Sequence, residues 1–315
     1  MLGDLRGPVP LSVESIGPLN RLFSDAFTDR YRRDGLAGVR VPPLNPEIWR
    51  YAIVDAGAGA MAWQDLAGQL VAFNVAHASG REGWMGPLAV HEAHQGRGVG
   101  AQIVRAGIEA LRQAGCTTIG LETMPRTMDN IGFYAQLGFI PAGMTITLTL
   151  EAARAPRPTL LSALGVGERE VAVARCAQLT DALSAGVDFT REIALTMRLG
   201  IGDLILLGPS DAPTGFALYH SAPLVEGRAR DELRVLKCAL RDAAALDALV
   251  QALAAAAQHE HCQRAAVRVQ EHFGWAFQAL VARGARVRWT DLRMTLADAP
   301  ERHPTAGLLL SNWEI

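Results

Sequence analysis

One short segment of the sequence, from Gly83 to Gly100 (GWMGPLAVHEAHQGRGVG), combines an alternating apolar run, a glycine-rich turn and the start of a helical pattern. Three glycines in the turn alternate with other residues: Gly96, Gly98 and Gly100. Because glycine lacks a Cβ atom, consecutive backbone N–H groups can close around a phosphate there, and a helix that begins at the turn adds the positive end of its dipole. Arg97 and Gln95 can supply charge or hydrogen bonds at the mouth of the loop. The segment therefore predicts an anion-binding site.

This segment resembles the cofactor loop of the GCN5-related N-acetyltransferase (GNAT) superfamily, which has the form Gln/Arg-x-x-Gly-x-Gly/Ala and follows a strand ending in Leu-x-Val. The matching residues are Gln95, Gly96, Arg97, Gly98, Val99, Gly100 and Ala101, preceded by Leu88, Ala89 and Val90. The resemblance implies that residues 88–90 offer backbone groups to the pantetheine arm of acetyl-CoA. It also implies that residues 95–101 hold the pyrophosphate of this cosubstrate.

A second match to the same superfamily lies in Phe133 to Phe139 (FYAQLGF), which resembles its Phe/Leu-Tyr-x-x-x-Gly-Phe segment. The resemblance implies that Tyr134 is the general acid that protonates the departing CoA thiolate. Members often carry an asparagine seven residues before this tyrosine, but Thr127 stands here and Asn130 comes later. No asparagine contact to the cofactor is therefore assigned. The motifs cover residues 60–140, and residues 1–60 agree only in the order of elements.

Transfer of an acetyl group from a thioester to an amine needs a neutral nucleophile, a polarised carbonyl and a proton for the departing thiolate. An alkyl ammonium has a pKa of about 10, so a base is required, directly or through water. Four candidates lie at or near the ends of predicted strands: Glu92, Glu122, His91 and Glu82. The resemblance implies direct transfer in a ternary complex, and no cysteine stands where a covalent acyl-enzyme would form.

The elements that must position these residues follow from hydrophobic periodicity. In the first half the sequence predicts helices and strands in this order: helices 18–29 and 46–54, strands 60–64, 69–77 and 84–91, helix 98–114, strand 117–123, helix 129–137 and strand 143–150. The second half is predicted to repeat the plan: strand 170–175, helix 189–199, strands 203–207, 215–220 and 232–240, a long helix from residue 242, strand 264–270, a helix to residue 283 and strand 287–296.

The two halves also share a faint repeat, because Gly138 and Gly284 each end a helix and each precede a strand that closes in Thr-Leu at the same spacing. We predict an α/β (α+β) fold of two tandem GNAT-like domains, each a mixed, mostly antiparallel sheet flanked by helices. Residues 1–150 form the catalytic domain, residues 151–167 a linker and residues 168–315 a degenerate domain. We also expect the closing segment, residues 307–315, to supply a terminal strand, across the domain boundary if the first half lacks one.

The second half is predicted to have lost the cofactor site. After its equivalent strand the chain runs into an alanine-rich helix, with no glycine before Gly274. If Gly284 is aligned with Gly138, Leu280 occupies the place of Tyr134. The second half is therefore expected to complete the substrate cleft or the fold of the first.

Composition limits the classes of protein. A chain of 315 residues, 50% of them hydrophobic, is long enough for two domains, and a net charge of −2 gives no basic excess for nucleic acid. No secretory signal is visible, and no apolar run reaches the length needed to span a bilayer, so no membrane association and a cytoplasmic location are expected. The four cysteines lie far apart, and the run His259 to Cys262 is interpreted as a polar connector, so no metal is predicted. A tandem chain can replace a dimer of single domains, which favours a monomer over a homodimer.

Two alternatives stay open beside acetyl transfer. The pattern Gly96-x-Gly98-x-x-Ala101, with Glu122 about the expected distance beyond it, also fits the fingerprint of NAD(P)-binding oxidoreductases. Several antiparallel strands come before it, however, and residues 91–95 separate the strand from the first glycine, which disfavours that fold. A non-catalytic acyl-CoA sensor or scaffold is the other alternative. The acceptor, a small-molecule or peptide amine, cannot be identified from the loops, although the segment 30–40 (RYRRDGLAGVR) could bind an acidic substrate or the 3′-phosphate of CoA.

Overall fold

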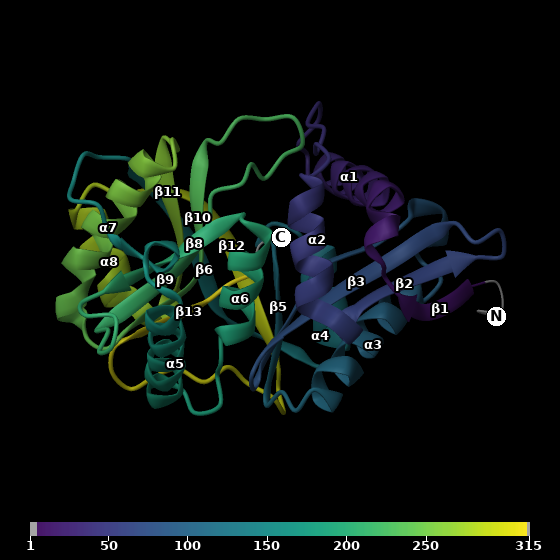
Figure 1. Ribbon diagram of the computed structural model, residues 1–315. Helices are drawn as coiled ribbons and strands as arrows, with labels where there is room; N and C mark the ends of the chain where they lie inside the picture. The colour runs from purple at the N-terminus through teal and green to yellow at the C-terminus, as the bar shows by residue number, and fades with distance from the viewer. Residues whose placement is uncertain (1–4, 314–315) are drawn as a thin grey trace.

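The computed structural model describes residues 5–313, which form one mixed sheet with helices on both of its faces (Figure 1). The strands are β1 (Leu5–Pro10), β2 (Ala60–Asp65), β3 (Leu70–Ser79), β4 (Glu82–Val90), β5 (Thr118–Thr123), β6 (Phe139–Glu151), β7 (Thr159–Leu160), β8 (Gly202–Leu207), β9 (Gly215–His220), β10 (Glu232–Leu240), β11 (Arg264–Gln270), β12 (Arg286–Leu296) and β13 (Leu308–Ser311). The α-helices are α1 (Ile16–Arg33), α2 (Pro46–Ala56), α3 (Val99–Gln113), α4 (Met128–Gln136), α5 (Val166–Leu183), α6 (Thr190–Leu199), α7 (Leu246–His259) and α8 (Gly274–Ala282).

The order of strands in the sheet is β1-β2-β3-β4-β5-β12-β6-β11-β10-β9-β8-β7, with β13 beside β10. Strands of the N-terminal half occupy one end of the sheet and strands of the C-terminal half the other, as the colours in Figure 1 show. Each half contains one parallel pair, β4 with β5 and β10 with β11. The other pairings are antiparallel, as expected for a mixed sheet of this class.

The two halves exchange a strand at the centre of the sheet. Strand β12 pairs antiparallel with β5, with Leu292 to Thr295 opposite Thr123 to Gly120, and also with β6. Strand β6 in turn pairs antiparallel with β11 along residues 145–151. The strand that follows the last helix of each half therefore pairs with the other half. Strand β12 pairs with β5 of the N-terminal parallel pair, and β6 pairs with β11 of the C-terminal parallel pair. Neither half of the sheet is complete without a strand from the other half.

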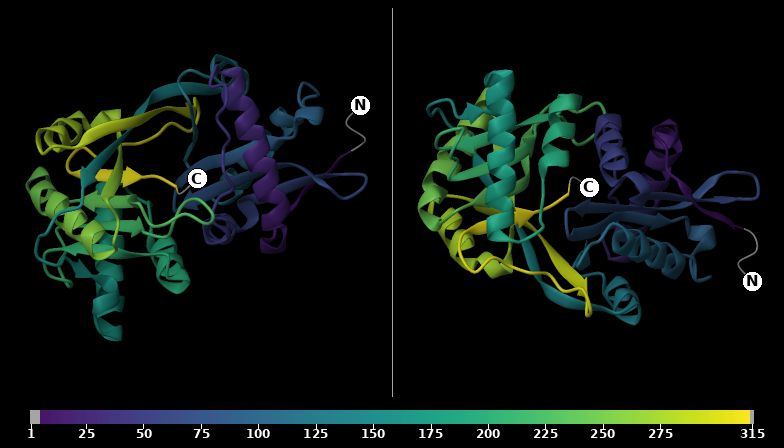
Figure 2. Two further views of the ribbon diagram at one scale, coloured as in Figure 1. Left: turned by 90° about the horizontal axis from the view of Figure 1, so that it is seen from above. Right: turned by 60° about the horizontal axis from the view of Figure 1, so that its bottom comes forward.

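Helices cover both faces of each half. In the N-terminal half, α1 and α2 pack on one face over Phe73 and Val75, and α3 packs on the other over Met85 and Leu121. In the C-terminal half, α5 and α6 cover one face, and α7 and α8 cover the other. The two views in Figure 2 show the same arrangement of helices around the sheet in both halves. This common arrangement agrees with the tandem architecture predicted from the sequence.

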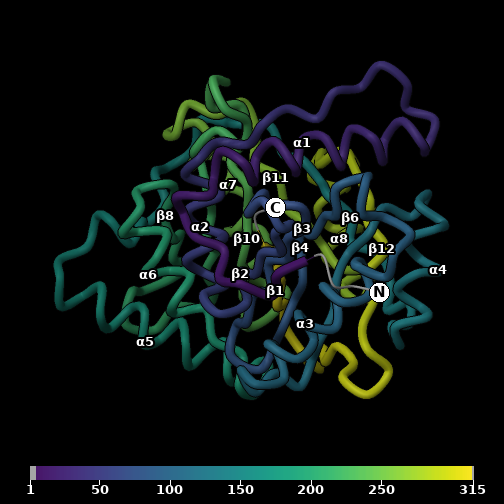
Figure 3. Tube along the Cα trace, turned by 90° about the vertical axis from the view of Figure 1, so that its right-hand side faces the viewer, coloured from purple at the N-terminus to yellow at the C-terminus, as the bar shows by residue number. Residues whose placement is uncertain are grey.

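Contacts outside the sheet also join the halves. Helices α2 and α6 pack together around Ile48, Tyr51 and Leu195. The loop between β9 and β10, green at the top of Figure 1, reaches the N-terminal half, where Leu224 O accepts a hydrogen bond from Asn45 N–H at 2.9 Å. Figure 3 shows α1 and the chain that follows it along the upper edge of the molecule. The halves thus meet over an apolar core as well as through paired strands.

The predicted fold class is confirmed, but one predicted strand is wrong. Residues 170–175 lie inside α5, although their valines alternate as in a strand. The buried side chains of α5 include Ala172, Cys176 and Leu179, a spacing of four and three residues that places them on one helical face. Glu168, at the third position of α5, accepts a hydrogen bond from Gly165 N–H at 3.0 Å and so stabilises the start of the helix.

The structure adds detail to two of the predicted segments. The segment 151–167 contains β7, which pairs with β8, and the first two residues of α5. The closing segment does supply a strand, β13, but β13 pairs with β10 of the C-terminal half, and β12 is the strand that crosses to β5. Residues 314–315 of that prediction lie outside the described residues. No helix within residues 5–313 has the length and apolar character that crossing a bilayer requires.

Candidate active site

The parallel strands β4 and β5 separate partway along their length. Their pairing runs from Glu82 to Met85 on β4 and ends there, whereas β4 continues beside β3 as far as Val90. The register of β3 and β4 shifts between Asn74 and Ala76, a β-bulge that falls at the point of separation. Beyond Met85 the edge of β4 that faces β5 carries no strand partner among the described residues. Residues 88–90, predicted to contact the pantetheine arm, lie on this edge.

A buried polar chain fixes the point at which the strands separate. His77 on β3 contacts the carbonyl oxygen of Gly86 through Nε2 at 3.2 Å and Asp55 of α2 through Nδ1 at 2.7 Å. Arg191 of α6 donates to the other oxygen of Asp55 at 2.9 Å. Burial works to raise the pKa of Asp55, but His77 and Arg191 outweigh it and lower this pKa, so the carboxylate stays charged. A residue of the C-terminal half thus helps to hold β4 in place.

The glycine loop has the backbone that an anion site requires. Gly96 and Gly98 have φ values of 71° and 83°, a region that L-residues with a side chain rarely adopt. Gly98 is the N-cap of α3, and the first backbone bond of the helix runs from Gln102 N–H to Gly98 O at 3.2 Å. The N–H groups of residues 99–101 therefore point away from the helix body without a carbonyl partner in it. This is the geometry that binds phosphate at a helix N-terminus.

Gln95 ties this loop to two neighbouring elements. Its side-chain Nε2 donates to Val90 O at the end of β4 at 2.8 Å. Its Oε1 accepts a hydrogen bond from Arg33 Nη1 at the end of α1 at 3.1 Å, and Arg33 also pairs with Asp29 at 2.6 Å. Gln95 therefore positions the loop through its side chain. Arg97 is exposed.

A cavity of about 730 Å³ opens where β4 and β5 separate. Seven of the predicted site residues line it: Leu88, Ala89, Val90, Gln95, Gly100, Glu122 and Tyr134. Helix α1 contributes apolar side chains to the wall, among them Phe23 and Phe27. The cavity is thus continuous with the glycine loop through Gln95 and Gly100. The remaining loop residues, Gly96, Arg97, Gly98, Val99 and Ala101, do not line it.

Tyr134 lies on α4 beside the glycine loop and lines the cavity. Its ring packs against Phe133 and Phe139 at centroid distances of 5.2 and 6.1 Å. Burial raises the pKa of its hydroxyl to about 12. The hydroxyl therefore keeps its proton at neutral pH, as a general acid must before transfer.

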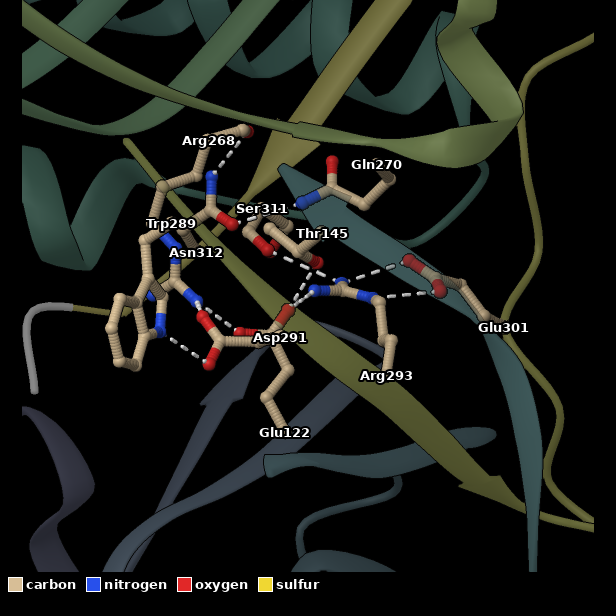
Figure 4. A network of polar contacts seen from close by, with 10 residues as sticks. All are labelled: Glu122, Thr145, Arg268, Gln270, Trp289, Asp291, Arg293, Glu301, Ser311 and Asn312. Atoms are coloured by element: carbon tan, nitrogen blue, oxygen red, sulfur yellow. Dashed lines mark hydrogen bonds and ion pairs between the residues drawn. The ribbon is translucent and has the colours of Figure 1, made fainter. Parts of the chain in front are cut away.

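Glu122 belongs to a network of polar contacts on the face of the sheet that lines the cavity (Figure 4). One carboxylate oxygen accepts from Arg293 Nη1 at 2.7 Å and from the Thr145 hydroxyl, and the other pairs with Arg268. Burial works to raise the pKa of Glu122, but Arg268 and Arg293 outweigh it and lower the pKa. Arg293 also pairs with Glu301 at 2.8 Å. Glu122 is therefore a charged group with three donors already in place.

The other predicted bases lie away from this cavity. Glu92 is exposed on the short 3₁₀ turn after β4 and lines a smaller hollow of about 290 Å³ next to the loop. His91 caps the same turn by accepting a hydrogen bond from Ala93 N–H at 3.2 Å. Glu82 is buried at the opposite end of β4, where burial and Glu301 raise its pKa. The structure brings Tyr134 and Glu122 to one cavity, but not these three residues.

Thr127, which stands where GNAT members often carry asparagine, joins α4 to the end of α1. Its hydroxyl donates to Asp34 at 3.1 Å, and Arg30 pairs with the same carboxylate. Arg126 donates to the carbonyl oxygen of Asp34. The start of the arginine-rich segment 30–40 is thus held against α4 at the rim of the cavity, and its first arginine is engaged within the protein.

Sequence reasoning missed the part of the cavity wall that the C-terminal half supplies. Five residues of that half line the cavity: Leu224, Arg268, Trp289, Asp291 and Trp313. Trp313 stacks on Trp84 at 5.4 Å, and the Arg293 guanidinium lies 3.6 Å from a ring of Trp84 on β4. The alternation of Trp289, Asp291 and Arg293 on one face of a predicted strand was a visible signal. It could not show that this face turns toward the other half.

Within residues 5–313, no group of three or more His, Cys, Asp or Glu side chains is arranged to hold a metal ion. The four cysteines are unpaired and buried. Glu260, in the histidine-rich run after α7, accepts hydrogen bonds from Ser221 and Arg230 at 2.8 and 2.9 Å.

Comparison with known proteins finds one family model and several solved structures that are similar to this chain. Residues 21–139 match the model of the acetyltransferase (GNAT) family. A Pyrococcus horikoshii protein assigned as an acetyltransferase superposes with a TM-score of 0.71 at 14% identity, covering 100% of this chain and 96% of its own. The tandem GNAT protein from the clavulanic acid biosynthesis pathway gives 0.60 at 16% identity, covering 95% and 100%. Saccharomyces cerevisiae N-myristoyltransferase, solved with bound myristoyl-CoA, gives 0.64 at 10% identity, covering 98% and 81%.

No curated protein matches the sequence. At these identities the solved structures show the fold, and the family model matches a segment of the N-terminal half. The match spans the glycine loop, the separated strands and Tyr134. Residues 21–139 therefore match the acetyltransferase (GNAT) family, and they lie in the N-terminal half of a fold that a tandem GNAT protein shares.

Proposed function

We infer that the protein transfers an acetyl group from acetyl-CoA to a primary amine by direct attack in a ternary complex, the acceptor being a small-molecule or peptide amine. The family match of residues 21–139 and the tandem fold support acyl transfer from an acyl-CoA as the general reaction. One observation carries the finer proposal: the glycine loop at the start of α3 is continuous with the cavity between β4 and β5. A pyrophosphate on the loop would direct the attached pantetheine arm into that cavity.

In this proposal, the direction of the pantetheine arm assigns a role to each site residue. The backbone of residues 88–90 would pair with the pantetheine amides, because this edge of β4 has no strand partner within residues 5–313. Residues 95–101 would hold the pyrophosphate, and Tyr134 would protonate the thiolate. Of the two catalytic bases predicted from the sequence, Glu122 lines the cavity and Glu92 does not.

We further propose the division into a catalytic domain of residues 1–150, a linker of residues 151–167 and a degenerate domain of residues 168–315. The cytoplasmic location and the monomeric state stay predictions. The second domain lacks a glycine loop at the start of α7, where an alanine run follows Asp242. Its contribution in this proposal is to complete the sheet and the cavity wall.

Calorimetric titration of acetyl-CoA into the wild type and Gly98→Glu tests the proposal. The variant places a carboxylate where the pyrophosphate would bind, so we expect one site per chain in the wild type and affinity lowered about tenfold or more in the variant. Gly115→Glu is a matched control at the other end of α3. Both glycines have a φ of 83°, and an added Cβ would meet no atom within 4 Å at either position, so both substitutions carry the same backbone strain.

The alternatives give different results in the same experiment. If Gly98→Glu and Gly115→Glu bind acetyl-CoA with equal affinity, the glycine loop is not part of the binding site. Binding of NADH in place of acetyl-CoA would favour a dinucleotide-dependent enzyme. Binding of acetyl-CoA without turnover across a panel of primary amines would favour the acyl-CoA sensor. Titration of longer acyl-CoA thioesters measures the preference for the acetyl group.

A further inference from the structure

Two charged residues of the C-terminal half lie on the cavity wall. Arg268 on β11 and Asp291 on β12 lie on the same face of the sheet as Glu122, and all three line the cavity (Figure 4). These residues lie outside the segment that matches the family model, which ends at residue 139. The half without a cofactor loop therefore supplies charged groups where an acceptor would meet the thioester.

Asp291 has hydrogen-bonding capacity left over. Its Oδ2 accepts from Arg268 Nη2 at 2.9 Å, and its Oδ1 accepts from Trp289 Nε1 at 3.0 Å. A carboxylate offers about four acceptor sites, so each oxygen keeps one lone-pair direction without a protein donor. Its side chain is 14% exposed, against 5% for Glu122, whose oxygens already receive three donors. Of the two buried carboxylates that this network presents to the cavity, Glu122 and Asp291, it is Asp291 that can still accept hydrogen bonds from a ligand.

The surroundings of Asp291 favour uptake of a proton. Burial raises its pKa and Glu122 on β5 adds to the rise, whereas Arg268 on β11 and the Trp289 hydrogen bond oppose it, and the net shift is upward. On the helix side, Tyr31 of α1 lies close enough for Asp291 to add to the rise in pKa that burial causes at the tyrosine. Tyr31 and Trp289 also give the cavity aromatic faces, which attract organic cations.

On the basis of the proposed acetyltransferase function, we propose that Asp291 binds the acceptor as its ammonium ion and takes the proton that must leave before attack. The acceptor class is then a cationic primary amine. The R–NH₃⁺ group gives one proton to the Asp291 carboxylate, and the neutral nitrogen forms a bond to the thioester carbon. The C–S bond breaks, the CoA thiolate takes the proton of the Tyr134 hydroxyl, and the second proton of the nitrogen passes through water to the Tyr134 oxygen, which restores the hydroxyl. The products are the N-acetyl amine and CoA–SH, with the Asp291 proton released to solvent.

The test compares Asp291→Asn with Asp298→Asn, an identical change at an exposed aspartate that pairs only with Arg112 on the surface. Acetyl-CoA affinity is measured by calorimetry, and kcat/KM is measured for a panel of primary alkylamines, amino acids and short peptides from pH 4 to 10. We expect Asp291→Asn to bind acetyl-CoA as the wild type does and to lose about 10²- to 10⁴-fold in kcat/KM. Asp298→Asn should match the wild type in both.

The pH profile separates a catalytic from a structural role. Without the carboxylate only the neutral amine in solution reacts, so kcat/KM of Asp291→Asn should rise about tenfold per pH unit up to the amine pKa. The wild-type value should level off above the pKa of Asp291. A wild-type profile and rate in Asp291→Asn would overturn the proposal. A wild type that binds no acetyl-CoA would instead overturn the proposed function on which it rests.

A second variant keeps the inference testable if Asp291→Asn does not fold. Trp289→Phe removes the hydrogen bond that lowers the pKa of Asp291, at a side chain that is already 43% exposed. The acid limb of kcat/KM should then move to higher pH, while acetyl-CoA affinity stays unchanged. An acid limb at the wild-type pH in this variant would contradict the role of Asp291.

Discussion

Tyr134 is the individual residue on which the proposed chemistry depends most. It is buried beside the glycine loop, and burial raises its pKa to about 12. We expect Tyr134→Phe to lower kcat by about 10²- to 10⁴-fold, because the thiolate would leave without a proton. Acetyl-CoA affinity should change little, since the ring and its contacts with Phe133 and Phe139 remain. Steady-state kinetics and calorimetry on the same preparations measure both quantities.

The control for this substitution is Tyr219→Phe. Tyr219 is buried in the core of the C-terminal half, and its hydroxyl donates to Glu260 at 3.4 Å, away from the cavity. The Tyr219→Phe substitution also removes one buried tyrosine hydroxyl, so it measures how the loss of such a group away from the cavity affects kcat. If Tyr134→Phe and Tyr219→Phe have equal kcat values, the thiolate receives its proton from another group, such as water.

At the scale of elements, β12 is the strand on which the molecule depends, because it lies between β5 and β6 and carries both Asp291 and Arg293. Arg293 is buried between Glu122 and Glu301. Arg293→Met should lower the free energy of unfolding by about 3–5 kcal/mol at pH 7, since it leaves buried carboxylates without their shared cation. Urea unfolding at several pH values measures this loss.

The loss should depend on pH in a defined direction. Against the effect of burial, Arg268 and Arg293 lower the pKa of Glu122 below the ordinary value of 4.5. The stabilisation from this ion pair is therefore present above pH 4.5 and is lost as the pH falls through the lowered pKa. The difference in free energy of unfolding between wild type and Arg293→Met should shrink over that range.

The control is Arg112→Met, at an exposed pair with Asp298, which should lower the free energy of unfolding by about 1 kcal/mol or less. A loss that is constant with pH would show that packing on Trp84, rather than charge, is what Arg293 contributes.

At the scale of the whole molecule, the exchanged strands make the two halves interdependent. If the chain is divided in the exposed segment between Ala155 and Pro156, β5 loses β12, and β6 loses both of its neighbours. Unpaired strand edges of this length favour aggregation. We expect each fragment alone to aggregate or to unfold without a cooperative transition, and the two co-expressed fragments to form a stable complex. Size-exclusion chromatography and circular dichroism test this.

A folded, monomeric fragment of residues 1–155 that unfolds cooperatively would contradict this interdependence. Such a fragment that also binds acetyl-CoA would place the cofactor site entirely in the first half. Even then, its turnover with amines should be lower than that of the whole chain, because Asp291 would be missing from the cavity wall.

Local patterns were enough to predict most of the fold. The strand, glycine turn and helix from residue 84 to residue 114 follow from alternation, positive-φ glycines and helical periodicity within one stretch of chain. Residues 170–175 were predicted wrongly because six residues with alternating valines fit a strand as well as a helix, and only the contacts of Cys176 and Leu179 decide between them. The terminal segment was predicted as a strand, but its partner strand could not be, since pairing over long sequence distances leaves no local signal.

By itself, the sequence determined the family resemblance, the repeat of one architecture in two halves, the glycine loop and the absence of an equivalent loop in the second half. These features depend on residue types at short spacing, where backbone geometry follows directly from glycine, helix caps and apolar periodicity. Only the tertiary structure decided that β12 inserts beside β5 and so brings Arg268, Trp289 and Asp291 to the cavity of the other half. That arrangement depends on which strand edges meet when the sheet closes and on the burial of charges between the halves, both of which are properties of the assembled molecule.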